Sequence, residues 1–168
     1  MGLDNRGALR VLHAAFREGP ACDELIRRFY TRWFALDVSL RDKFPPDMGG
    51  QRAAFAHALH WVYGELVAQH ATEPVEFLAQ LGRDHRKYGV TEAHYETLRQ
   101  ALHATLRSEL ADEWSDTVEE AARQSLNLIT GVMSGAADAD VGPAWWDGTV
   151  IEHLRVSRDL AVVRLQLD

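Results

Sequence analysis

The sequence predicts an all-α domain that is followed by a short β-hairpin. Apolar residues recur at helical spacing up to about residue 137, and no alternating run interrupts them. After residue 148 the pattern changes to alternation in two runs that are rich in Val, Ile and Leu. A length of 168 residues fits one domain with a small appendage.

Local signals divide the first part of the chain into helices. Gly19-Pro20 separates the first helix from the second, because Pro is tolerated at the first turn of a helix. Pro45-Pro46 stops a short turn that begins near Ser39 and ends at Phe44. The expected helices span residues 4–17, 20–36, 39–44, 51–69, 72–89, 91–110 and 113–137.

The later helices start at similar signals. Gly49-Gly50 precedes the helix at 51–69, whose apolar side includes Phe55. Thr72-Glu73-Pro74 opens the next helix, and Thr91 can cap the one after it.

A linker and a hairpin follow the last helix. Residues 138–148 are rich in Asp, Gly and Pro, and the runs at 149–156 and 160–167 alternate on either side of a short turn. We therefore expect a helical domain at 1–137, a linker at 138–148 and a β-segment at 149–168.

The charge balance excludes several classes of partner. The net charge is −7 and Lys and Arg form no run longer than a pair, so nucleic acid and anionic membrane surfaces are not expected partners. No apolar run reaches the roughly 20 residues that a membrane span needs. The single cysteine, Cys22, suits a reducing cytosol, so a cytoplasmic protein is expected.

The functional signal comes from five residues that follow one another along the chain: Tyr30, Phe44, Gln51, His85 and Tyr95. His85 is a candidate axial ligand for a haem iron, because a neutral imidazole nitrogen binds that metal well. Its second ring N–H would donate to a carbonyl one turn back, at Leu81 or nearby. Tyr30 lies on the inner side of its helix, and Gln51 follows a flexible glycine pair, so both could face bound gas. Phe44 would supply an apolar wall.

With Phe55 and Tyr95, these residues resemble the N-terminal globin domain of bacterial flavohaemoglobins. The resemblance covers about residues 4–137, and residues 144–168 are similar to the start of that family's flavin-binding barrel. It implies a globin fold and haem b (protohaem IX). It assigns catalytic roles to Tyr30, Gln51 and Tyr95, haem contacts to Phe44, Phe55, Leu81, His85 and Tyr88, and iron ligation to His85.

The resemblance also implies a reaction. Flavohaemoglobins oxidise nitric oxide to nitrate with O2, using electrons that pass from NAD(P)H through FAD. The implied ligands are O2, NO and CO, and the implied partner is a flavin reductase domain. FAD and NAD(P)H would bind to domains beyond this chain, which has no Gly-rich loop for a dinucleotide. A globin that binds or senses O2 or NO without turnover is the alternative.

One departure from the family concerns the last helix. In flavohaemoglobins the proximal His is bonded by two residues, the Tyr to which Tyr95 corresponds and a Glu in the last helix. Here residues 127–137 contain no acid. Met133 or a neighbour occupies the position of that Glu. Glu120 lies roughly 20 Å away along a helix, too far to replace it. We therefore expect His85 to be less imidazolate-like, with weaker support for O–O cleavage.

Two further alternatives remain at this stage. His57 and His60 are spaced for a metal pair on one helix, but no other ligand lies at a suitable spacing, which disfavours a zinc site. A helical interaction domain without a cofactor is the second. The hairpin is marginal by itself, so either the chain is part of a longer protein or the hairpin packs on the helices or on another copy.

Overall fold

The computed structural model describes residues 4–70 and 72–167. Residues 1–3, 71 and 168, which the expected domains include, lie outside the described residues. The elements in order are α1 (Asn5–Ala15), α2 (Pro20–Leu36), η1 (Val38–Lys43), α3 (Gly49–Ala68), α4 (Thr72–His85), η2 (Arg86–Tyr88), α5 (Glu92–Glu109), α6 (Asp116–Ala139), β1 (Gly148–Arg155) and β2 (Ala161–Leu167), where η marks a 3₁₀-helix.

Side chains near the helix starts satisfy free backbone N–H groups. The Asp4 carboxylate accepts a hydrogen bond of 2.6 Å from the Gly7 N–H at the start of α1. At the start of α5, the backbone N–H of Thr91 donates to Nδ1 of His94 over 3.0 Å, as part of a reciprocal capping box. The predicted cap at Thr91 is thereby confirmed.

Two predicted helices differ in extent from the structure. The stretch expected to end near Gly89 is α-helical to His85 and 3₁₀-helical to Tyr88, and Gly89, in a left-handed conformation (φ 64°), ends it. The last helix begins at Asp116 rather than 113, because Ser115 caps it, and it continues to Ala139, past the expected end at residue 137.

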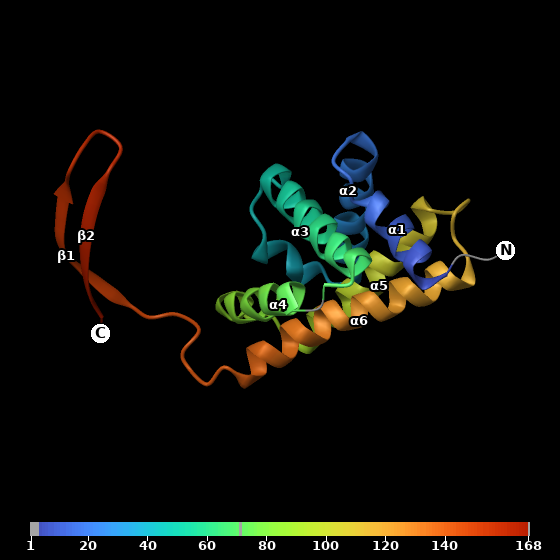
Figure 1. Cartoon of the computed structure of the whole chain (residues 1–168). Helices are drawn as coiled ribbons and strands as arrows, with labels where there is room; N and C mark the ends of the chain where they lie inside the picture. Colours follow the sequence, from blue (N-terminus) through green and yellow to red (C-terminus); the bar gives the residue numbers. More distant parts are fainter. Residues whose placement is uncertain (1–3, 71, 168) are drawn as a thin grey trace.

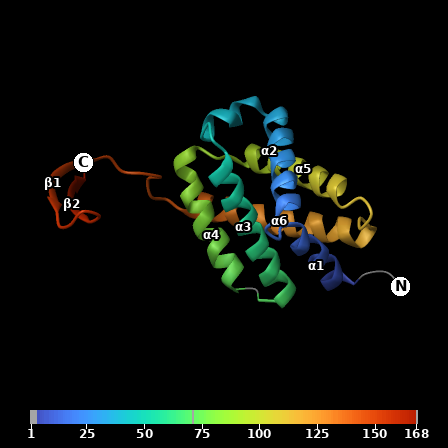
Figure 2. The same ribbon diagram turned by 90° about the horizontal axis from the view of Figure 1, so that it is seen from above.

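The helices pack in two layers around one core. The long helix α6 runs along one side of the helical body and contacts α1, α4 and α5, while α2 lies across α5 and α3 (Figures 1 and 2). The largest fully buried side chains come from several helices: Leu12, Phe16, Ile26, Phe29, Leu40, Tyr63, Leu102, Leu106 and Leu126. No helix in the described ranges combines the length and apolarity that crossing a bilayer requires.

The predicted hairpin is confirmed. Strands β1 and β2 pair in antiparallel fashion with Val150 opposite Leu165 and Leu154 opposite Val162, and a bulge interrupts the register next to Val150. All residues of both strands are exposed, and the hairpin stands apart from the helices in Figures 1 and 2. Trp145 and Trp146, in the preceding linker, are also exposed. The fold is therefore helical with a C-terminal two-stranded hairpin, as expected.

Candidate functional site

The helical body encloses a cavity of about 530 Å³, which is within the usual size range of small-molecule sites. Most of its lining is apolar, with Trp33, Leu59, Leu98 and Ile129 among the contributors. Every residue that the sequence assigned to the site lines this cavity: Tyr30, Phe44, Gln51, Phe55, Leu81, His85, Tyr88 and Tyr95. The fold thus collects residues from α2, α3, α4 and α5 around one space.

His85 stands at the C-terminal end of α4 with one ring nitrogen already engaged. Its Nδ1 lies 2.7 Å from the carbonyl oxygen of Leu81, so Nδ1–H donates and the predicted hydrogen bond is confirmed. In the neutral ring with its proton on Nδ1, the lone pair is on Nε2, and Nε2 forms no hydrogen bond to any described residue. The ring of Tyr88 lies edge-on to the imidazole, with 6.1 Å between centroids. This is the tautomer that a metal-ligating histidine needs.

Tyr30 and Gln51 form a polar pair in an aromatic environment. The side-chain amide of Gln51 donates to the Tyr30 hydroxyl over 3.3 Å. The Tyr30 ring is buried against Phe44 and Phe55, at centroid distances of 5.5 and 5.7 Å. Burial raises the pKa of Tyr30 to about 12, so the phenol stays protonated at neutral pH. Since its oxygen accepts from Gln51, its own proton is free for another acceptor.

Tyr95 differs from what the resemblance implies. The ring is buried, but the hydroxyl has no hydrogen-bond partner among the described residues. It does not bond to His85, because the imidazole Nδ1–H is taken by Leu81. The expected bond from Tyr95 to His85 is therefore absent. Burial raises the pKa of Tyr95 to about 12, and the charges of Glu92 and Asp138 add to the effect.

Sequence reasoning missed Asp138 and two lysines. Asp138 acts on Tyr95 because α6 continues past the predicted end at residue 137. Lys43 and Lys87 also line the cavity, and both contact Tyr88: the Lys43 ammonium donates to its carbonyl oxygen over 2.9 Å, and the Lys87 ammonium lies 5.1 Å from its ring centroid. Neither forms an ion pair with a described carboxylate. No local pattern distinguishes these two lysines from ordinary surface cations.

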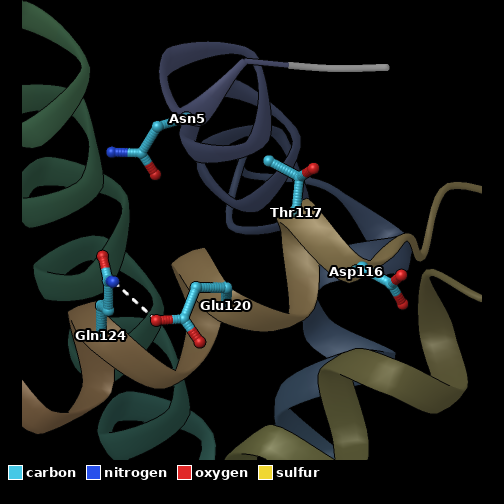
Figure 3. Close-up of a pocket in the computed structure, with 5 residues that line it drawn as sticks. All are labelled: Asn5, Asp116, Thr117, Glu120 and Gln124. Atoms are coloured by element: carbon cyan, nitrogen blue, oxygen red, sulfur yellow. Dashed lines mark hydrogen bonds between the residues drawn. The ribbon is translucent and has the colours of Figure 1, made fainter.

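A second, solvent-open depression lies at the other end of α6 and is lined by residues with polar side chains (Figure 3). Its lining residues are Asn5, Asp116, Thr117, Glu120 and Gln124. Here the Glu120 carboxylate accepts hydrogen bonds of 2.6 Å each from Gln124 and Arg123. Glu120 does not line the apolar cavity, in agreement with the expectation that it cannot replace the missing proximal acid.

The histidines outside the cavity form no comparable centre. His60 stacks on His13 of α1 with 4.2 Å between ring centroids instead of pairing with His57. Within residues 4–70 and 72–167 there is no group of three or more His, Cys, Asp or Glu side chains placed to hold a metal ion. His94 also lines the cavity, but its Nδ1 accepts from the Thr91 N–H over 3.0 Å and its Nε2 lies 3.9 Å from the Asp37 carboxylate. Among the described residues, His85 is therefore the cavity histidine with a ring nitrogen that has no protein partner.

The cavity fits an iron porphyrin. Apolar walls suit a flat macrocycle, Nε2 of His85 suits its metal, and two unpaired ammonium groups suit its carboxylates. The fold and site therefore define a helical protein whose cavity, with one suitably placed histidine, has the chemistry to hold a metal-containing macrocycle. A family model described as Globin matches residues 27–133, which is more than half of the chain and includes each of the predicted site residues. The chain belongs to the globin family, and membership implies haem and a diatomic ligand. A search of curated proteins gives no match.

Proposed function

We propose that this domain binds haem b through His85 and holds O2 or NO next to Tyr30 and Gln51. The observation that supports this most strongly is His85 itself: it lines the apolar cavity with Nδ1–H fixed on Leu81 and Nε2 free. Bound haem supplies an iron that binds diatomic gases and exchanges electrons.

The protein's own contribution is position and polarity. The Leu81 carbonyl holds the His85 ring in one tautomer and one orientation. The Tyr30 phenol, neutral because of its burial, donates its free proton to a ligand that carries partial negative charge, and Gln51 fixes the direction of that proton. Phe44 and Phe55 keep water away from this pair.

Within the globin family, we propose more specifically that the chain belongs to a flavohaemoglobin-type oxidoreductase. In this proposal residues 1–137 are the haem domain, 138–148 the linker and 149–168 the opening hairpin of a flavin-binding barrel. The reaction is the oxidation of nitric oxide to nitrate by O2, with an electron that NAD(P)H supplies through FAD in a reductase domain. The Tyr30–Gln51 pair and the hairpin directly after the helical domain support it.

A gas-binding or gas-sensing globin without turnover is the second candidate. The proximal side favours it, because His85 donates to a neutral carbonyl and Tyr95 makes no hydrogen bond to it. A histidine without a carboxylate partner donates less electron density to its metal. Steady-state consumption of NO with NADPH and a flavin reductase would favour the enzyme. Stable gas binding without such consumption would favour the sensor.

The test of haem ligation is optical. The purified chain is reconstituted with haemin, reduced, and compared with His85→Ala and with His57→Ala, which removes an exposed histidine outside the cavity. We expect the parent and His57→Ala to give the same five-coordinate ferrous spectrum and His85→Ala to lose it. An unchanged spectrum in His85→Ala would refute the assignment.

A further inference from the structure

The residue directly after His85 ties α4 to the segment that leaves α6. Arg86 opens η2, and its guanidinium forms an ion pair of 2.7 Å with the Asp140 carboxylate and a hydrogen bond to the Gly142 carbonyl oxygen. The Arg86 side chain is only 21% exposed. Asp140 also accepts from the Gly142 N–H over 3.2 Å, so the three residues form a closed cluster, here called the Arg86 clasp.

The clasp lies directly after His85, and a close contact between α4 and α6 lies three residues before it. That contact is at Gly82, whose backbone packs directly on the backbone of Met133. Side-chain hydrogen bonds between charged groups are stronger than neutral ones, and partial burial protects this one from screening by salt. The backbone on both sides of His85 is therefore anchored to α6 and to its exit.

We propose that Arg86 is a positioning residue that couples the His85–iron bond to the linker. This inference rests on the proposed function. The linker runs from Asp140 and Gly142 into β1, so a displacement of the hairpin by a docked domain reaches His85 through the clasp. The orientation of the His85 ring toward a bound iron would then depend on the position of the C-terminal segment.

The experiment uses the full chain loaded with haem. The variants are Arg86→Gln, Asp140→Asn and the double variant, and the matched control is Arg83→Gln. Arg83 lies one turn earlier on α4 and bonds only to Gln80 of the same helix. Two quantities are measured: the iron–histidine stretching band of the ferrous form by resonance Raman, and the rate of haem transfer to an acceptor apoprotein.

We expect each single clasp variant to shift or broaden the iron–histidine band. Each should also speed haem loss about 10-fold, the lower end of the effect of losing a group that orients a metal ligand. The double variant should be no worse than Arg86→Gln alone, because both changes break the same cluster. Arg83→Gln should match the parent. Arg86→Lys should recover part of the effect, since an ammonium keeps the charge but not the paired geometry.

The outcomes separate this inference from the proposed function. A parent that does not bind haem refutes the proposed function. A haem-loaded parent whose clasp variants keep its Raman band and haem-loss rate refutes the coupling alone. Equal changes in Arg83→Gln would show general destabilisation and would also refute it. Hydrogen exchange of residues 85–92 in the apoprotein gives a second measurement: the clasp variants should exchange faster there than Arg83→Gln, and equal rates would count against the clasp.

Discussion

Gly82 of α4 and Met133 of α6 touch backbone to backbone. A Cβ at Gly82 would lie 2.7 Å from both the carbonyl carbon and the Cα of Met133, closer than real Cβ contacts come. The close crossing brings the end of α4 with His85 down onto α6, and only glycine permits it. The contact therefore fixes one wall of the haem cavity.

Gly82→Ala should destabilise the fold by about 1–3 kcal/mol, the usual cost of overpacking, although alanine is the better helix former. The control is Gly131→Ala on the exposed side of α6, where a Cβ meets nothing within 4 Å. That variant should be neutral or stabilised by up to about 1 kcal/mol. Denaturant unfolding of both proteins measures the difference, and equal stability would show that the helices can separate without cost.

Loss of the Tyr30 hydroxyl should speed O2 release. A hydrogen bond to a charged partner contributes about 1.5–3 kcal/mol, which corresponds to roughly a 10- to 100-fold faster dissociation in Tyr30→Phe. Tyr63→Phe is the control, because this buried Tyr bonds to Ser125 and does not line the cavity. Stopped-flow kinetics give both rates. A rate within twofold of the parent for Tyr30→Phe would mean that the phenol does not meet the ligand.

The proximal side should behave as a neutral imidazole. We expect the iron–histidine stretch to lie below that of flavohaemoglobins with a proximal Glu, because Leu81 offers only a carbonyl. Tyr95→Phe should leave this band in place and stabilise the fold by about 1 kcal/mol, since it removes a buried hydroxyl without a partner. A high, peroxidase-like frequency that falls in Tyr95→Phe would instead show that Tyr95 acts on His85.

Acid should destabilise the helical body through His13. Burial lowers the pKa of His13, and the nearby His60 and Arg17 lower it further. Below the unfolded-state pKa of about 6.5, the unfolded chain takes up a proton that the folded chain does not, so stability falls as the pH drops below about 6.5 and is unaffected above it. His13→Gln should flatten this slope, while His57→Gln, an exposed change, should keep it. Unfolding midpoints between pH 5 and 8 test both.

The hairpin should contribute nothing to haem binding. None of the described residues 141–167 lines the cavity, so truncation after Gly142, which keeps the residues of the Arg86 clasp, should keep the haem spectrum. The exposed apolar strands have unpaired edges, so the truncated protein should also self-associate less. The full chain should not bind FAD, because about twenty residues cannot enclose a flavin. Stoichiometric FAD binding, or loss of haem on truncation, would contradict the domain assignment.

Several helix starts could be predicted because their signals are local, although the start of α6 was placed three residues too early. Thr91 and the Gly19-Pro20 pair sit at the positions where the structure begins α5 and α2. The ends of α4 and α6 were harder to predict from the sequence. Gly89, the residue that interrupts the backbone, lies four residues after the end of α4. Residues 137–139, where α6 ends, contain no Gly or Pro that would stop a helix. The change from helical to alternating pattern located the hairpin.

The site was predictable as a set of residues but not as a set of contacts. Order along the chain sufficed to collect Tyr30, Gln51 and His85 around one cavity, and local helix geometry gave the bond to Leu81. Contacts between distant segments, such as the ion pair of Arg86 with Asp140, depend on how the helices cross. They cannot be predicted from the sequence around either residue. The same holds for Tyr95, whose unpaired hydroxyl the resemblance did not anticipate.

The placement of the tryptophans gives the chain a built-in optical reporter. Trp33 lines the cavity, so its emission should be quenched by energy transfer to a bound porphyrin. Trp145 and Trp146, at 61% and 64% exposure, emit from water at longer wavelengths. Emission from the linker pair should shift to the blue when another surface covers that segment. The total intensity would then fall as the cavity fills, while the wavelength of the emission in the haem-free chain would report whether the linker is covered.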